Sequence, residues 1–328
     1  MTSRIVFMGS DPIALPSLEA LYAGLCGSID IVAIYTQPDR ARGRGKKVVP
    51  NEIKQWAESK AIAVFQPEKI GKVDRLEMEA LDLDAILVMA YGQMLSQKLI
   101  DTPRCSIWNL HTSLLPQYRG ASPIQCAVAS GDAETGVSLM RIVRKMDAGP
   151  VLDQERVSIG RLDTALDVEH RLSEACVPLL KRNFAKIFEG TTNPIEQEPD
   201  RISYVRKLGK EDGELDFSVS ASVLASRVNG LFPWPSTRFY YKGDAIKVGL
   251  ADFEEGSGSD IPGTVLEASP TGLRIACESG VVVFKAMQRA GGRMLGGDAF
   301  LRGFPIEEGT VLESRNLSSL VSSTHFVG

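Results

Sequence analysis

The first 150 residues repeat one pattern: short apolar runs rich in β-branched residues alternate with longer segments of mixed polarity. This alternation is typical of α/β folds, in which helices cover both faces of a parallel sheet. The predicted strands are residues 4–8, 29–36, 62–65, 84–90, 105–110 and 137–143. Because ligands of such folds bind beyond the carboxyl ends of the strands, we expect the functional residues in the loops at that edge.

The rest of the chain predicts a second domain of a different kind. Apolar residues at helical spacing over 163–189 predict a long helix that closes a first domain of residues 1–189, and the polar, proline-containing stretch 190–207 predicts an extended linker. Residues 208–315 show one helix, 220–230, and then short strand-like runs broken by glycine, proline and aspartate. We therefore expect a Rossmann-like domain followed by a smaller, OB-like β-barrel, with a frayed serine-rich tail at 316–328.

Composition excludes several classes of protein. No apolar run approaches the ~18 residues that a membrane span requires, and no secretory signal precedes the first strand, so we expect a cytoplasmic protein with no membrane partner. Five scattered cysteines without a C-x-x-C pair suggest neither disulfides nor a zinc site, and no metal is expected. Neither G-x-G-x-x-G nor a P-loop motif occurs, which argues against a nucleotide cofactor. We expect a monomer.

The densest group of chemically useful residues is Asn109–Gly120, which begins at the carboxyl end of the predicted strand 105–110. Asn109 and His111 are two residues apart and so share one face at the strand's carboxyl end. An imidazole that exchanges a proton near neutral pH, beside an amide that can donate to an oxyanion, suits acyl transfer to an amine. Asp147 follows another predicted strand and can approach to orient the histidine. A lone histidine is more often a packing residue, but His170 and His325 lack such surroundings.

A second group is a basic segment with glycines just after the second strand. It contains Arg40, Arg42, Arg44, Lys46 and Lys47. Such a segment cannot pack in a core, and the net charge of −4 gives the whole chain no general attraction for nucleic acid. We expect a flexible loop that binds a phosphate backbone, with a solvated surface loop as the alternative. Lys285, Arg289 and Arg293 form a weaker basic stretch in the second domain.

These residues carry a resemblance that covers nearly the whole chain. The matching motifs, in order, are Thr36–Arg40 with Gly43–Lys47, Phe65–Pro67, Ala90–Gly92, Asn109–Pro116, Tyr118–Gln125, Gly131–Val137, Met146–Gly149, Phe232–Pro235 and Phe300–Gly303. With them the sequence resembles the methionyl-tRNA formyltransferases.

The resemblance implies transfer of a formyl group from 10-formyltetrahydrofolate, the donor, to the α-amino group of methionine on initiator tRNA, a step of translation initiation. It implies that Asn109, His111 and Asp147 are the catalytic residues. It further implies a folate-binding role for two groups, Ser113, Leu114, Leu115 and Pro116, and Ala90, Tyr91 and Gly92. The basic segment, Arg40, Arg42, Arg44, Lys46 and Lys47, corresponds to the tRNA-binding loop.

Other readings remain open from the residues. Glycinamide ribonucleotide and sugar-nucleotide formyltransferases resemble the first domain and share the Asn, His and Asp arrangement, so the three residues indicate formyl transfer and not the acceptor. The basic segment and the second domain favour a large polyanionic acceptor. A non-catalytic RNA-binding protein on the same scaffold is the reading from a different class.

Overall fold

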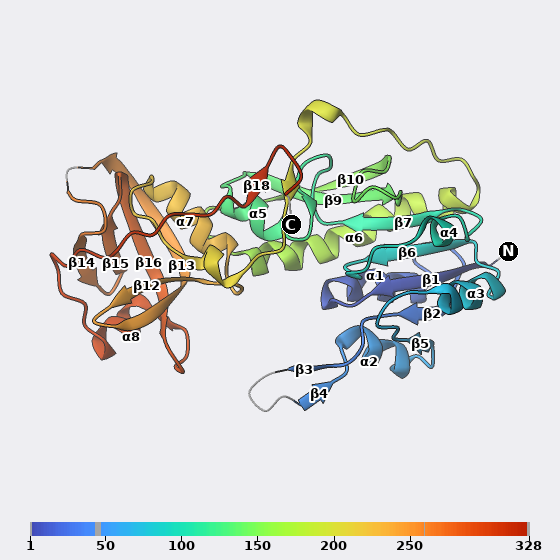
Figure 1. Ribbon diagram of the computed structural model, residues 1–328, viewed down its shortest axis with the longest axis horizontal. Helices are drawn as coiled ribbons and strands as arrows, with labels where there is room; N and C mark the ends of the chain where they lie inside the picture. Colours follow the sequence, from blue (N-terminus) through green and yellow to red (C-terminus); the bar gives the residue numbers. More distant parts are fainter. Residues whose placement is uncertain (1, 43–46, 259, 327–328) are drawn as a thin grey trace. The chain divides into compact units, whose positions relative to one another are not determined.

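The structure is a computed structural model that describes residues 2–42, 47–258 and 260–326 (Figure 1). The chain divides into two compact units. The first unit consists of the residues up to Arg119, Gly136–Val157 and His170–Ile202. The second unit consists of Gly120–Thr135, Ser158–Glu169 and the residues from Ser203 onward.

Within the described residues, seven strands form the sheet of the first unit in the order β10-β9-β7-β6-β1-β2-β5. Their bounds are β1 Ser3–Gly9, β2 Ile29–Tyr35, β5 Ala63–Phe65, β6 Ala85–Met89, β7 Ile107–His111, β9 Glu134–Arg141 and β10 Val151–Ser158. β1 is parallel to β2 and β6, β2 to β5, and β6 to β7. The predicted parallel sheet is confirmed, and the carboxyl ends of β1, β2, β6 and β7 share one edge.

Buried apolar side chains on the sheet and on its covering helices account for this arrangement. All five residues of β6 are buried, as expected for a central strand covered on both faces. One face packs Val6 and Ile86 against Met78 and Leu99, which come from two of the covering helices. The short α-helices of this unit within the described residues are α1 Leu15–Tyr22, α2 Glu52–Ser59, α3 Lys72–Ala80 and α4 Gln97–Ile100, and most of the long helix α6 (Ala165–Phe188) also belongs to it. Asp11 accepts a hydrogen bond from the Ile13 amide and so caps the short 3-10 turn, η1 Pro12–Ala14, that precedes α1.

Two strands at the β10 edge differ from the simple parallel pattern. β9 is antiparallel to β7, with His111 opposite Ser138 and Trp108 opposite Arg141. The carboxyl end of β9 therefore lies at the opposite edge of the sheet from His111. β10 is a strand that the sequence pattern did not predict, because its middle residues are polar and none of its residues is fully buried.

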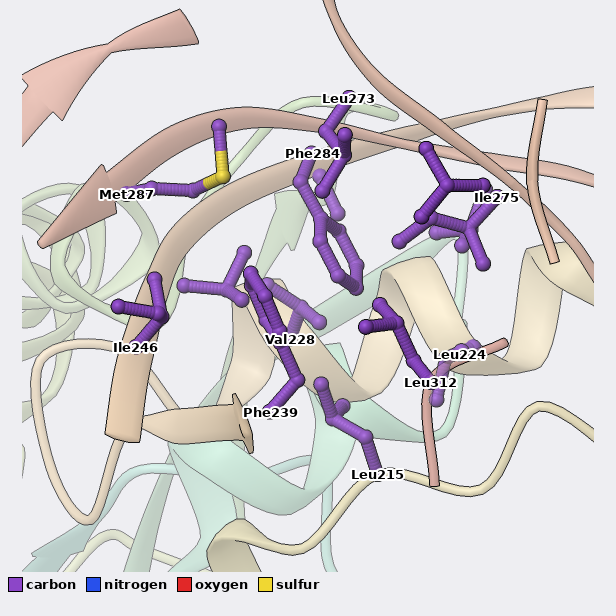
Figure 2. Close-up of a cluster of buried hydrophobic side chains, with 14 of the residues drawn as sticks. Leu215, Leu224, Val228, Phe239, Ile246, Leu273, Ile275, Phe284, Met287 and Leu312 are labelled. Atoms are coloured by element: carbon purple, nitrogen blue, oxygen red, sulfur yellow. The ribbon is translucent and has the colours of Figure 1, made fainter. Parts of the chain in front are cut away.

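The second unit is built on an antiparallel sheet in the order β12-β13-β16-β15-β14, with β17 paired to β16. The bounds are α5 Pro123–Ala129, α7 Ala221–Gly230, β12 Thr237–Tyr241, β13 Asp244–Ser257, β14 Val265–Ser269, β15 Gly272–Ala276, β16 Ser279–Arg289, β17 Leu295–Gly296 and α8 Gly297–Gly303. Register shifts in the long β13–β16 pair allow this sheet to curl. Figure 2 shows Leu224 and Val228 of α7 pointing at Phe239 and Phe284 of the sheet. The predicted fold class is confirmed.

The stretch after the long helix and the tail of the chain contain more regular structure than the sequence predicts. The predicted long helix is α6 (Ala165–Phe188), and the residues after it keep an extended course with short pieces of regular structure, η2 Pro199–Arg201, β11 Tyr204–Val205 and η3 Lys210–Gly213. The expectation of a frayed tail was wrong: β18 (Val321–Ser322) pairs antiparallel with β11. A two-residue strand leaves no local pattern when its partner strand lies more than a hundred residues away in the sequence. The domain boundaries themselves stay a prediction.

Candidate active site

His111 is the last residue of β7, and groups in the first unit face both nitrogens of its ring. Nε2 lies 3.0 Å from the backbone carbonyl oxygen of Tyr118, and Nδ1 lies 3.8 Å from Oδ2 of Asp147. A carbonyl oxygen only accepts hydrogen bonds, so Nε2 is the nitrogen that carries the proton. Nδ1 is then the atom that can accept a further proton, and it faces a carboxylate able to stabilise the resulting imidazolium.

Asn109 lies on the same face of β7, two residues before His111. Its side chain is half-buried, and within the described part of the chain no group forms a hydrogen bond with its amide. An amide N–H that no protein group uses is available to a substrate oxygen. The Asn109 amide can therefore donate a hydrogen bond to a developing oxyanion, next to His111 as the proton acceptor.

Asp147 reaches His111 by a different route from the one that adjacent parallel strands would give. It lies in the turn between β9 and β10, which must fold back because β9 ends at the far edge of the sheet. Asp147 has a φ of 47°, in the left-handed region. Gly149 is required in this turn, since a Cβ there would lie 1.9 Å from the carbonyl oxygen of Arg141.

The segment Ser113–Pro116 follows His111 and is fixed to β9 and to the edge strand β10. The Leu115 amide donates to Ser138 Oγ at 3.0 Å, and that hydroxyl donates to the Ser113 carbonyl at 2.6 Å. Gln154 Nε2 donates to the Leu115 carbonyl at 3.0 Å and to Ser138 Oγ at 2.8 Å. Ser113, Leu115 and Pro116 are buried, whereas Leu114 is partly exposed. Of these four side chains, Leu114 has the most surface to offer a ligand.

The turn Ala90–Gly92 follows β6 at the same edge. Ala90 and Gly92 are exposed and have φ values of 49° and 81°. The Tyr91 ring points into the hydrophobic cluster of the first unit, and burial raises the pKa of its hydroxyl well above the ordinary value. A ligand at this turn would therefore meet its backbone and not the Tyr91 side chain.

Part of the basic segment is a β-hairpin. β3 (Arg40–Arg42) pairs antiparallel with β4 (Lys47–Val49), and residues 43–46, which include Arg44 and Lys46, lie outside the described residues. The expectation of a flexible loop was wrong for residues 40–42 and 47, which lie in paired strands. Arg40 forms an exposed ion pair with Glu68 at 2.7 Å, and because such pairs contribute little, a phosphate can compete for it.

The base of this hairpin is anchored by Asp39. Its carboxylate accepts hydrogen bonds from Gln66 Nε2 and from Lys54 Nζ, both at 2.7 Å. These bonds lower the pKa of Asp39 below its ordinary value. Gln37, two residues earlier, donates through Nε2 to the Tyr91 carbonyl at 3.1 Å. The hairpin and the Ala90–Gly92 turn thus share one hydrogen-bonded support.

Comparison with known proteins supplies the family. Residues 3–182 match the model described as formyl transferase, and residues 207–305 match the formyl transferase C-terminal domain. A curated methionyl-tRNA formyltransferase from Acidiphilium cryptum is 40% identical over 94% of this chain and 99% of its own length. One from Natranaerobius thermophilus is 36% identical over 94% of this chain and 100% of its own length. The chain belongs to the methionyl-tRNA formyltransferase family.

Solved structures share the fold of this methionyl-tRNA formyltransferase family member. A sugar 3N-formyltransferase, determined in the presence of dTDP and 5-N-formyl-THF, has a TM-score of 0.66 and 16% identity, covering 89% of this chain and 100% of that one. The N-formyltransferase from Helicobacter canadensis, in complex with folinic acid and dTDP-3-aminofucose, has a TM-score of 0.65 and 17% identity, covering 88% and 100%. At these identities the likeness shows the fold alone.

Three further expectations concern the weaker basic stretch, membrane spans and metal sites. In the second unit, Lys285 and Arg289 each lie near an aspartate, Asp252 at 3.7 Å and Asp244 at 3.0 Å, so much of their charge is compensated locally. The described residues contain no helix long and apolar enough to cross a membrane. They also contain no cluster of three or more histidine, cysteine or acidic side chains that could hold a metal ion.

Sequence reasoning missed the groups that hold His111 and the Ser113–Pro116 segment in place. The Tyr118 carbonyl fixes Nε2 of His111, yet a backbone acceptor has no sequence signature. Ser138 and Gln154 sit on strands whose pairing had to be known before their hydroxyl and amide could be assigned a role. The available signal was weak: apolar Val151, Leu152 and Val157 flank the polar residues 153–156, a pattern that an edge strand tolerates.

Proposed function

We propose that this protein transfers the formyl group of 10-formyltetrahydrofolate to the α-amino group of methionine on initiator tRNA. The observation that carries the chemistry is the pairing of His111 with Asp147 beside the unused amide of Asn109. Family membership over nearly the full chain supports methionyl-tRNA as the acceptor. Translation initiation uses this product, and the role places the protein in the cytoplasm.

His111 acts on the amine. The Tyr118 carbonyl holds the proton on Nε2, so the Nδ1 lone pair takes a proton from the attacking amino group as its nitrogen forms a bond to the formyl carbon. Asp147 stabilises the imidazolium that results. When the bond between the formyl carbon and the donor nitrogen breaks, the same imidazolium returns its proton to that nitrogen. The proton count is therefore balanced over one turnover.

Asn109 acts on the formyl oxygen. As the amine adds, negative charge builds on that oxygen, and the Asn109 side-chain N–H is free to donate to it. A preorganised donor in a partly buried position stabilises this charge without reorganising water. The two residues on one face of β7 thus handle the proton and the charge separately.

The folate donor supplies a formyl group already bonded to a nitrogen that can leave. We propose that it lies against the Ala90–Gly92 turn and the Ser113–Pro116 segment, both at the carboxyl edge of the parallel strands. The hydrogen bonds from Ser138 and Gln154 hold the second segment in place before the donor arrives. Leu114 offers an apolar contact, and the exposed backbone at Ala90 and Gly92 offers polar ones.

The hairpin β3–β4 is proposed to contact the tRNA. It follows β2, whose carboxyl end lies at the same sheet edge as His111 because the intervening strands are all parallel. Arginine and lysine bind phosphates strongly, and the segment from Arg40 to Lys47 contains five of them. The hydrogen bonds of Asp39 fix the position of the base of this hairpin.

An acceptor panel tests the function. The protein is incubated with 10-formyltetrahydrofolate and, in separate reactions, methionyl initiator tRNA, glycinamide ribonucleotide and an amino-sugar nucleotide. We expect a formylated product from the tRNA alone. Product from either small amine instead would assign a different acceptor, and RNA binding without product from any acceptor would favour a non-catalytic RNA-binding protein. His111→Ala serves as the control for background formylation.

A further inference from the structure

Gln197 lies in the segment that follows α6, outside every motif discussed above, and is half-buried. Its Oε1 accepts hydrogen bonds from Nε and Nη2 of Arg119 at 3.0 and 2.7 Å. Its Nε2 donates to the carbonyl oxygens of Asp147 at 2.8 Å and Gly149 at 2.7 Å. A guanidinium only donates and a carbonyl only accepts, so these partners fix the orientation of the amide.

The two ends of this amide reach the two segments that hold His111. Arg119 is buried, with 3% of its surface exposed, and is bonded in sequence to Tyr118, whose carbonyl accepts from His111 Nε2. Asp147, whose own carbonyl accepts from Gln197, supplies the carboxylate that faces Nδ1. One side chain therefore connects the supports on both sides of the imidazole.

The Gln197 backbone has its own anchor. Ile195 and Val151 exchange hydrogen bonds in both directions, each at 2.8 Å, and Val151 begins β10 immediately after the Asp147 turn. The amide is thus presented from a fixed strand pairing to a turn whose Asp147 has a φ of 47°. Such a turn is unfavourable for a residue other than glycine and needs outside support to persist.

We propose that Gln197 is a positioning residue for the reaction: it holds the Asp147 turn against Arg119 and so sets the distance between the Asp147 carboxylate and His111. This inference rests on the proposed function of His111 and Asp147. Gln197 acts through these residues and does not touch the reacting atoms. Loss of its bonds should lower kcat while leaving the KM for each substrate nearly unchanged, because the folate and tRNA contacts lie elsewhere.

Two variants separate the two ends of the amide. Gln197→Ala removes all four hydrogen bonds, whereas Gln197→Glu keeps an acceptor for Arg119 and places a second oxygen against the carbonyls of Asp147 and Gly149. We expect both to lower kcat by about 10- to 100-fold, the usual effect of misplacing a catalytic group through its support. Glu196→Ala, an exposed neighbour in the same segment, is the matched control and should keep the wild-type kcat.

A double-mutant cycle with Asp147→Asn tests whether the effect runs through Asp147. If it does, Gln197→Ala should cost much less in the Asp147→Asn background than in the wild type. Hydrogen exchange gives a readout without activity: amides of residues 142–149 should exchange faster in Gln197→Ala, with the midpoint of global unfolding little changed. Fully additive rate losses, or unchanged exchange in this turn, would overturn the inference. Failure of the wild-type protein to formylate methionyl-tRNA would instead refute the proposed function, and the exchange result would still decide the structural role of Gln197.

Discussion

His111 depends on neighbours on both sides of its ring for its protonation and position. The Tyr118 carbonyl assigns the proton of His111 to Nε2, and the turn at Asp147 places a carboxylate on the other side. Asn109 differs, because within the described residues its amide has no partner to satisfy. Position and protonation are thus prepared for His111, while the Asn109 amide is left for the substrate.

Asn109→Ala is the sharpest test of the oxyanion role. Removing one preorganised donor should lower kcat by about 10²- to 10³-fold. Because the side chain has no protein partner to lose, the unfolding midpoint should stay close to that of the wild type. Steady-state kinetics and thermal unfolding measure both quantities; a kcat near the wild-type value would show that the formyl oxygen is stabilised by another group.

At the scale of single residues, sequence reasoning identified the groups with distinctive chemistry and missed their supports. Asn109 and His111 share a strand face because side chains alternate along a strand, and this holds without knowledge of the fold. The approach of Asp147 depends on β9 running antiparallel, which its apolar sequence does not distinguish from a parallel strand. Gln197 bonds to two backbone carbonyls, which leave no pattern in the sequence.

At the scale of elements, the edge strand β10 and its neighbour β9 form the platform for the Ser113–Pro116 segment. Gln154→Ala removes two donors, one to the Leu115 carbonyl and one to Ser138 Oγ. We expect the dissociation constant for the folate donor to rise by up to roughly 30-fold, since each of the two neutral hydrogen bonds contributes about 1 kcal/mol. Binding of tRNA should be unaffected. Calorimetric titration with each substrate distinguishes this result from a general loss of folded protein, which would weaken both.

The hairpin β3–β4 makes a prediction about salt. Each single-strand phosphate neutralised contributes a slope of roughly −0.7 to log affinity against log salt concentration. The triple variant Arg42→Ala, Arg44→Ala, Lys46→Ala should bind charged tRNA more weakly and with a flatter slope, while its folate affinity stays the same. The control changes three exposed lysines elsewhere, Lys69, Lys98 and Lys186, to alanine. Equal slopes in both triple variants would leave the segment a solvated surface feature.

Prediction of the elements succeeded where burial and periodicity agree. The fully buried run of β6 and the long amphipathic α6 were both expected close to their observed bounds. β10 was not, because polar residues at a half-covered edge resemble a loop. β18 was not, because two residues gain their structure from a distant partner, β11.

At the scale of the whole molecule, a buried charge cluster ties distant segments of the second unit together. The Asp212 carboxylate, fully buried, accepts hydrogen bonds from Arg206 at 2.8 and 2.6 Å, from the Gly209 amide at 2.7 Å and from the Ser318 hydroxyl. Arg227 donates to the Asp212 carbonyl at 3.1 Å and to the Ser318 carbonyl at 3.0 Å. The cluster holds Ser318 against the segment around Asp212.

The same cluster predicts acid sensitivity. Burial alone raises the pKa of Asp212, but the hydrogen bonds from Arg206, Gly209 and Ser318 outweigh it and lower the pKa from 3.8 to about 2. The stabilisation is therefore complete above pH 3.8 and is lost as the pH falls through about 2, a change of roughly 2 kcal/mol. Urea unfolding at a series of pH values should show this loss. Asp212→Asn should be less stable at neutral pH and lack this component, whereas the exposed Asp200→Asn should retain it.

The central claim is that His111 moves the proton during formyl transfer to methionyl initiator tRNA. Single-turnover formylation, with both substrates bound at saturation, isolates that chemical step from binding. The wild-type protein should form formylmethionyl-tRNA, and His111→Ala should do so about 10²- to 10⁴-fold more slowly while binding both substrates normally. Absence of product with the wild-type protein, or an equal single-turnover rate in His111→Ala, would contradict the account.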